Sequence, residues 1–202
     1  MSEDELIIVA NRLPVEAVTD PTGGVTWKVS PGGLVAAVEP SLKGRQGVWL
    51  GWNGRYESPG ESTLPPIPET DESRDYRIAE VALARKDVEL YYDGFSNSAL
   101  WPLYHDAIAT PIYHRHEFDA YRRVNMLFAQ AAARAAAPGT TVWVHDYQLQ
   151  LVPEMLRSLR PDLRIGFFLH IPFPAPDLFL QLPWRRELVL GILGADLVGF
   201  QT

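Results

Sequence analysis

Polar side chains follow the apolar runs of this sequence at the points where the runs end. In chain order they are Asn11 and Arg12, His145 and Asp146, His170, and Gln201 and Thr202. Carboxylate and imidazole groups exchange protons and form hydrogen bonds with polar ligands. In open α/β folds, ligands bind at the carboxyl ends of parallel strands, which meet at one edge of the sheet. If the runs are parallel strands, we expect these side chains to line one ligand crevice.

Each of these side chains also has a purely structural interpretation. Asp146 could cap a following helix, because a side-chain oxygen in that position accepts hydrogen bonds from backbone N–H groups. His170 could be a buried histidine with a hydrogen-bond partner, and Arg12 could belong to a surface ion pair. The residue types alone leave both interpretations open.

The segment SPGG, at residues 30–33, precedes an apolar stretch with helical spacing. Backbone N–H groups at such a glycine turn can approach a phosphate or a carboxylate. An ordinary Gly-Gly turn fits the segment equally well. The patterns G-x-G-x-x-G and G-x-x-x-x-G-K-[ST] are both absent. The sequence therefore gives poor support to a P-loop or to the dinucleotide-binding domain of an oxidoreductase.

Two further segments were considered for chemistry. His114 and His116 flank an arginine in a spacing that matches no standard zinc pattern, so we expect no metal site. The stretch YYDGFSNSALWP is dense in aromatic and polar groups. It could be a helix and loop packed on the core by Phe95, Leu100 and Trp101, or its tryptophan could serve as a platform for a sugar, and the sequence leaves both open.

The order of the elements predicts an α/β fold. Strands are expected at residues 5–10, 47–53, 76–83, 141–144, 164–170 and 196–200, a hairpin strand at 25–29, and helices at 34–42, 117–137, 151–159 and 177–193. A turn is expected at residues 20–24 and a mobile loop at 58–75. The second half alternates helix and strand through short links, which favours a Rossmann-like parallel sheet with helices on both faces.

The composition limits the classes of partner. The chain of 202 residues carries a formal net charge of −7, so it lacks the overall positive field that binds nucleic acid or acidic lipid. It has no cysteine, which excludes disulfides and thiolate metal sites and fits a reducing cytoplasm. No apolar run approaches the roughly 20 residues of a membrane span, and the acidic N-terminus is unlike a signal peptide. We expect a cytoplasmic globular protein with no membrane or nucleic-acid partner.

Seven motifs, taken in order, resemble the trehalose-6-phosphate synthase family. They are VANRLPV, SPGGLVAAVEP, GVWLGWNG, YYDGFSNSALWPLYH, YRRVNMLFAQ, VWVHDYQLQLVPEMLR and IGFFLHIPFPAPDLF. The resemblance covers nearly the whole chain, and HDYQL and FFLHIPFP are its most specific parts. Members of this family are retaining glycosyltransferases. They transfer glucose from a nucleotide-activated glucose, such as UDP-glucose, to glucose 6-phosphate and so produce trehalose 6-phosphate.

The resemblance implies one half of a GT-B glycosyltransferase, in which two Rossmann-like domains face each other across a cleft. Residues 1–202 would be the N-terminal, acceptor-side domain, incomplete at its C-terminal end. The nucleotide-sugar-binding C-terminal domain would be absent, together with the basic residues that steady the leaving diphosphate. We therefore expect this fragment to be inactive alone. Formation of a homo-oligomer is left open.

The resemblance assigns the acceptor site to four residues. Arg12 and Tyr92 would bind the phosphate of glucose 6-phosphate, the first through its guanidinium fork. Trp101 would line the same pocket. Asp146 would bind the hydroxyl groups of the acceptor and orient the one that attacks.

On the donor side, the resemblance assigns Gly33 and His170. Gly33 would approach the donor diphosphate with its backbone N–H, and His170 would touch the donor glucose. Asp146 and His170 would thus be the catalytic residues. Retaining transfer could use a carboxylate nucleophile, but the resemblance places Asp146 on the acceptor and implies a reaction on one face of the donor sugar. It implies neither a metal nor a cofactor.

A different class of function is the alternative. The chain could be a non-catalytic domain that binds a sugar phosphate or acts as a regulatory scaffold. A degenerate scaffold is expected to lose some of the side chains assigned above, and this sequence retains all of them. The enzyme interpretation is therefore preferred.

Overall fold

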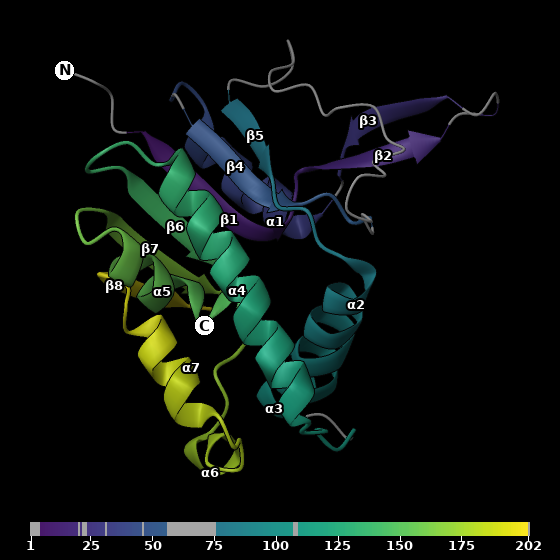
Figure 1. The fold of residues 1–202 in the computed structure, drawn as a ribbon, viewed down its shortest axis with the longest axis vertical. Helices are drawn as coiled ribbons and strands as arrows, with labels where there is room; N and C mark the ends of the chain where they lie inside the picture. Colours follow the sequence, from purple (N-terminus) through teal and green to yellow (C-terminus); the bar gives the residue numbers. More distant parts are fainter. Residues whose placement is uncertain are drawn as a thin grey trace.

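The computed structural model of the protein describes residues 5–19, 21, 24–30, 32–45, 47–55, 76–106 and 109–201. Within them, six parallel strands form one sheet, in the spatial order β5 (Tyr76–Glu80), β4 (Gly47–Trp52), β1 (Leu6–Arg12), β6 (Thr141–His145), β7 (Arg164–Leu169) and β8 (Leu197–Phe200). Figure 1 shows the strands fanning across the upper part of the molecule. The expected Rossmann-like α/β sheet is confirmed.

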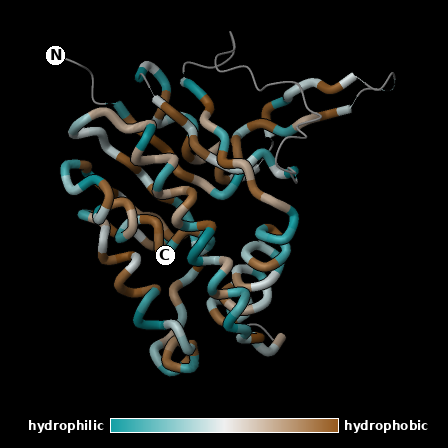
Figure 2. Tube along the Cα trace, in the orientation of Figure 1, coloured by the Kyte–Doolittle hydropathy of each residue, from teal (hydrophilic) through white to brown (hydrophobic). Residues whose placement is uncertain are grey.

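The central strands β1 and β4 are almost entirely buried, because the middle of the sheet is covered on both faces. Successive side chains of β1 point to opposite sides, so Ile7 and Val9 belong to a large core on one face. Ile8 and Ala10 belong to a smaller core on the other face. In Figure 2 hydrophobic positions run through the strands, while hydrophilic positions mark the outer turns of the helices.

Helices lie on both faces, with most of them on the side of the large core. They are α1 (Gly33–Val38), α2 (Arg85–Val88), α3 (Trp101–Tyr104), α4 (Arg115–Ala135), α5 (Val152–Leu159), α6 (Pro176–Phe179) and α7 (Arg185–Ile192). Two short 3-10 turns, η1 (Glu39–Leu42) and η3 (Tyr147–Leu149), and one π-helix, η2 (Glu89–Leu100), complete the described helical segments. Helix α4 crosses in front of the sheet, and α1 lies behind it with the smaller core (Figure 1).

A separate antiparallel hairpin, β2 (Val15–Thr19) and β3 (Val25–Val29), follows β1. The strand expected at residues 25–29 is confirmed, and its partner β2 was not predicted. Of the turn expected at residues 20–24, only residues 21 and 24 are described. The loop expected at residues 58–75 lies outside the described residues.

The single helix expected at residues 177–193 is wrong. The structure has two helices there, α6 ending at Phe179 and α7 beginning at Arg185. Pro183 lies between them, and proline has no N–H to donate to the preceding turn. The helix expected at residues 34–42 likewise passes from α1 into the 3-10 turn η1, which has Pro40 in its first turn.

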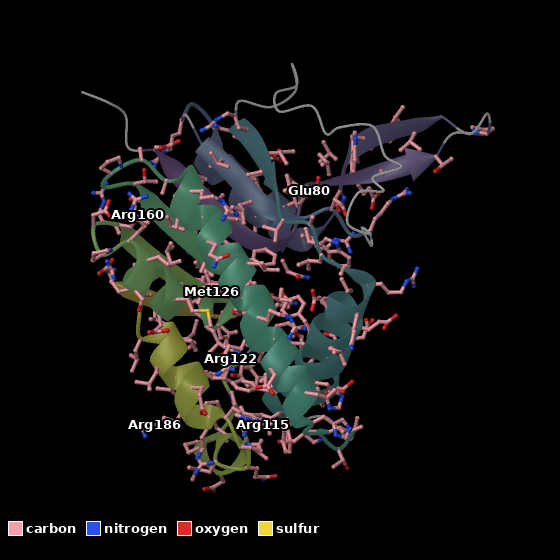
Figure 3. The ribbon with its side chains drawn as sticks, viewed as in Figure 1. Glu80, Arg115, Arg122, Met126, Arg160 and Arg186 are labelled. Carbon is pink, nitrogen blue, oxygen red and sulfur yellow. The ribbon has the colours of Figure 1, made fainter. Side chains whose placement is uncertain are left out.

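The long helix α4 is fastened at its carboxyl end by Arg160, which Figure 3 shows beside the strands. Its guanidinium donates to the carbonyl oxygens of Ala133 and Ala136, at 2.9 and 2.8 Å. A cation at this end also opposes the negative pole of the helix dipole. None of the helices in the described ranges is long and apolar enough to cross a bilayer.

Candidate active site

A cavity of about 270 Å³ opens where β1 and β6 end. Its lining includes Arg12 from β1, Gly33 from α1, Tyr92 from η2, and Asp146 and Gln148 from the segment after β6. Four of the six residues to which the resemblance assigns a role, Arg12, Gly33, Tyr92 and Asp146, therefore line one cavity, although they come from four separate stretches of the chain. Their individual roles stay a prediction.

Arg12 presents its guanidinium on the face of an aromatic ring. The guanidinium carbon lies 4.9 Å from the ring centroid of Trp52, within the range of a cation–π contact. Gly54, with a φ of 85°, lies so close that an added Cβ would fall 2.0 Å from a guanidinium nitrogen. The backbone of Arg12 is fixed as well, because its carbonyl accepts a hydrogen bond of 3.0 Å from Nε1 of Trp49. None of the ion pairs among the described residues uses Arg12, so its charge is available to a ligand.

Tyr92 reaches the cavity from the π-helix η2. Its ring lies 6.2 Å from that of Trp52, centroid to centroid. The preceding residue, Tyr91, is fully buried and donates a hydrogen bond of 2.9 Å to Oδ1 of Asn11. Because Asn11 and Tyr91 precede Arg12 and Tyr92, this bond ties the two parts of the site together. π-Helical turns are rare and are frequent at functional sites.

Asp146 has a strained backbone, with a φ of 75° and a ψ of 170°. This region is adopted almost only by glycine and costs a side-chain-bearing residue roughly 1–3 kcal/mol. Its Oδ1 accepts hydrogen bonds from the backbone N–H groups of Tyr147, at 2.9 Å, and of His170, at 3.3 Å. The capping interpretation is therefore correct for Oδ1. No hydrogen bond within the described ranges uses Oδ2, which leaves that oxygen for a ligand.

The charge state of Asp146 reflects two opposed effects. Burial raises its pKa above the ordinary value, because the ionised carboxylate loses water. The N–H groups of Tyr147 and His170 oppose this rise by stabilising the carboxylate. An ionised carboxylate in such surroundings is a strong hydrogen-bond acceptor.

Two buried side chains of α4 hold the segment after Asp146. The hydroxyl of Tyr121 donates to the carbonyl of Tyr147, at 2.7 Å. The side-chain amide of Asn125 donates to the carbonyl of Gln148 at 2.9 Å and accepts from the N–H of Leu151 at 3.0 Å. The backbone groups of this buried turn are therefore paired by α4, which fixes Asp146 and Gln148 at the cavity.

Gly33 is the first residue of α1. The helix has no side-chain cap, and Gly32, in the capping position, also lines the cavity. No heavy atom lies within 4 Å of the position that a Cβ on Gly33 would take. Backbone N–H groups at the start of a helix attract anions, so this side of the cavity suits a negatively charged group.

The other two predicted site residues, Trp101 and His170, are not part of this lining. Trp101 is 43% exposed and stacks on His105, with ring centroids 4.3 Å apart. Of the three residues that could pack this stretch on the core, Phe95 and Leu100 are fully buried and Trp101 is not. His170 joins the site through its backbone bond to Asp146.

Two residues with clear parts in the site were not singled out from the sequence: Gln148 lines the cavity, and Trp52 supports Arg12. Gln148 lies two residues after Asp146, so its nearness to the HD motif was the available signal. His145, expected at the crevice, lies behind it and makes a ring-to-ring contact with His170. Nothing in the sequence separates Trp52 from an ordinary core tryptophan.

Two other hollows lie along the outer face of α4. They share Arg122 and Met155, and Figure 3 shows Arg122 and Met126 on the side of α4 that faces α7. Their walls are helix surfaces rather than strand ends. In the part of the chain that the structure describes, no three histidine, aspartate or glutamate side chains gather into a metal site.

The fold and the cavity define a Rossmann-like α/β domain with a cavity at its strand ends that is lined by a guanidinium, from Arg12, and a carboxylate, from Asp146. The model of glycosyltransferase family 20 matches residues 4–202. Trehalose-6-phosphate synthase of Mycobacterium tuberculosis is 56% identical over 198 residues, which cover 98% of this chain and 40% of that protein. The enzyme of the same name from Mycobacterium ulcerans is 57% identical over 198 residues, which cover 98% and 39% of the two chains.

Solved structures similar to this chain come from proteins of the same kind. The trehalose-phosphate synthase of Burkholderia xenovorans, in complex with glucose-6-phosphate, has a TM-score of 0.79 and 40% identity, covering 98% of this chain and 40% of its own. A trehalose-6-phosphate protein of E. coli, bound with UDP-2-fluoro glucose, has a TM-score of 0.80 and 32% identity, with coverages of 98% and 40%. The chain belongs to glycosyltransferase family 20. It spans about two fifths of the length of these relatives.

Proposed function

We propose that this chain binds glucose 6-phosphate and is the acceptor-side domain of a retaining glycosyltransferase that makes trehalose 6-phosphate. The observation that carries the proposal is the combination, in one cavity, of the Arg12 guanidinium and the Asp146 carboxylate. The first suits a phosphate and the second a sugar hydroxyl. The Burkholderia relative, which was solved with glucose-6-phosphate, supports this choice of ligand.

The phosphate end of the ligand would meet Arg12 and Tyr92. A guanidinium already placed over the Trp52 ring loses less side-chain freedom on binding, and its fork matches two phosphate oxygens. The Tyr92 hydroxyl would add a hydrogen bond from the neighbouring wall. Trp101 would contact the acceptor with the exposed part of its ring, although it stacks on His105 and is not part of the cavity lining described above.

The hexose end would meet Asp146. Oδ1 is occupied by two backbone N–H groups, so Oδ2 would accept from an acceptor hydroxyl and orient that oxygen for attack. The strained backbone of Asp146 suits such a task, since strain of this kind persists where the surroundings fix a residue for function.

The donor would be a nucleotide-activated glucose, which we take to be UDP-glucose because the E. coli relative was solved with UDP-2-fluoro glucose. Gly33 would contact its diphosphate through the backbone at the start of α1, and His170 would contact the glucose. Most donor contacts would come from a second domain in a GT-B arrangement, outside these 202 residues.

The chemistry would take place on one face of the donor glucose. Asp146 is already bonded on one oxygen and is assigned to the acceptor, so it does not serve as a nucleophile on the donor. The acceptor oxygen attacks the anomeric carbon, the bond to the diphosphate breaks, and the departing phosphate takes the hydroxyl proton. Asp146 and His170 would then act by position and charge. Both substrates are charged phosphate esters that do not cross membranes unaided, so the cytoplasm is the proposed compartment.

Ligand-dependent thermal stability tests the binding half of this proposal. A ligand that binds only the folded chain raises the melting temperature according to its concentration and affinity. We expect glucose 6-phosphate to raise it more than glucose or inorganic phosphate at equal concentration. Equal shifts with glucose 6-phosphate and phosphate would favour a general anion site instead. Binding without transfer is expected for these 202 residues under either function, so only a chain that also carries the proposed second domain can separate the enzyme from a sugar-phosphate-binding scaffold.

A further inference from the structure

His145, the first residue of the HD motif, is fully buried at the end of β6. Its Nδ1 lies 3.0 Å from Nε2 of His170. Its other ring nitrogen, Nε2, is buried and has no hydrogen-bond partner among the described residues. Two imidazole nitrogens at this separation share one proton, so one ring donates and the other accepts.

His145 is neutral in the folded protein. Burial lowers its pKa to about 3, and the adjacent His170 adds to this effect. A neutral imidazole carries one N–H, on either Nδ1 or Nε2. Burial also lowers the pKa of His170, so near neutral pH that ring too carries a single proton.

The surroundings choose between the two tautomers of His145. With its proton on Nε2, the ring would bury an N–H that has no acceptor among the described residues. With its proton on Nδ1, the ring donates to His170 and leaves only a bare nitrogen without a partner. Buried N–H groups without a partner are rarer in proteins than under-used acceptors. The second arrangement is therefore favoured.

We propose that His145 is a positioning residue, which donates from Nδ1 to Nε2 of His170 and so fixes His170 as the tautomer protonated on Nδ1. The Nδ1 atom of His170 makes no hydrogen bond within the described ranges and is not among the buried polar atoms without a partner. It is therefore accessible, and His170 offers a ligand a donor rather than an acceptor.

The two residues of the HD motif hold His170 at two points. His145 holds the ring, and Oδ1 of Asp146 accepts from the backbone N–H. The tautomer is a property of the chain itself. Only its use, donation to an oxygen of the donor glucose, rests on the proposed function.

Long-range ¹H–¹⁵N correlation of the ¹⁵N-histidine-labelled protein tests this assignment without any ligand. We expect His170 to show an unprotonated Nε2 and a protonated Nδ1 at about pH 7.5, above the ordinary pKa of histidine. A protonated Nε2 on His170 would overturn the proposal. The His170→Asn variant identifies the resonances by their loss.

Two substitutions of His145 separate positioning from simple packing. His145→Leu removes the donor, so His170 should lose the unprotonated Nε2 signal and revert to the Nε2-protonated form that free imidazole side chains prefer. His145→Asn can place an amide N–H where Nδ1 lies and should preserve the wild-type signals. His116→Asn changes an exposed histidine and should alter neither. Identical His170 signals in wild type and His145→Leu would contradict the proposal. If His145→Leu does not fold, the wild-type spectrum still shows which nitrogen of His170 carries the proton.

Discussion

The guanidinium of Arg12 lies on the ring of Trp52, 4.9 Å from its centroid, with Gly54 pressed against its nitrogens. This arrangement holds a positive charge at the mouth of a cavity with no carboxylate partner among the described residues. An exposed arginine normally samples many rotamers, and fixing it on binding costs affinity. Here the aromatic face has already restricted it.

Substituting Arg12 by alanine is expected to weaken glucose 6-phosphate binding roughly 10- to 100-fold, because a charge-assisted hydrogen bond contributes about 1.5–3 kcal/mol. Arg12→Lys should recover only part of the loss, since an ammonium group cannot form the two parallel bonds of the fork. Titration calorimetry measures the affinity of each variant for glucose 6-phosphate. Arg186→Ala, at an exposed arginine of α7, is the control. Equal affinity in wild type and Arg12→Ala would exclude Arg12 from the phosphate site.

Asp146→Asn keeps an oxygen for the N–H groups of Tyr147 and His170 but replaces the second acceptor, Oδ2, by a donor. We expect the affinity for glucose 6-phosphate to fall roughly tenfold and that for inorganic phosphate to stay unchanged. Parallel titrations with the two ligands check this, with the exposed Asp177→Asn as the matched control. A similar loss of affinity for glucose 6-phosphate and for inorganic phosphate would contradict the assignment of Asp146 to the sugar hydroxyls. It would mean that the substitution disturbs the phosphate site or the fold.

Asn125→Leu is expected to destabilise the fold by roughly 2–4 kcal/mol, because it leaves the carbonyl of Gln148 and the N–H of Leu151 unpaired in the core. Urea unfolding followed by circular dichroism measures the change. Gln130→Leu makes a similar substitution at an exposed position of the same helix and should change the unfolding free energy by about 0.5 kcal/mol or less. Comparable losses in the two variants would show that the buried amide contributes nothing special.

The stability of the protein is expected to fall with pH below 6.5 in part through His145. In the unfolded chain the His145 imidazole has its ordinary pKa of 6.5, whereas burial in the folded protein lowers that pKa to about 3. Unfolding therefore takes up a proton in that window, so this group's contribution is fully present above 6.5 and is lost toward 3, by up to about 1.4 kcal/mol per pH unit. Urea unfolding across the window should show a shallower slope for His145→Leu. Parallel slopes would mean that the imidazole is not the group responsible.

Much of the fold follows from the pattern of the sequence. Strands such as residues 47–52 are continuous apolar runs, as the middle of a parallel sheet covered on both faces requires. Short polar links between alternating helices and strands then fix the topology. The gathering of Arg12, Gly33 and Asp146 follows in the same way, since they lie at strand ends or at a helix start. Tyr92 lies inside η2, and only the family resemblance pointed to it.

The features that the sequence did not predict depend on contacts between distant segments. The exposure of Trp101, the positive φ of Asp146 and the bond between the rings of His145 and His170 are set by how elements meet, which no local pattern records. The π-helix η2 has no distinctive periodicity in a sequence rich in aromatic and small residues. The break at Pro183 was visible in the sequence, and the continuous helix was the wrong choice there.

Calorimetric titration of this chain with glucose 6-phosphate, with glucose as the control ligand, tests the central claim most directly. The account predicts saturable binding at one site that requires the phosphate, because Arg12 and Asp146 already line one cavity in the chain itself. Absence of binding, or equal binding of glucose, would contradict the assignment of this cavity to the acceptor.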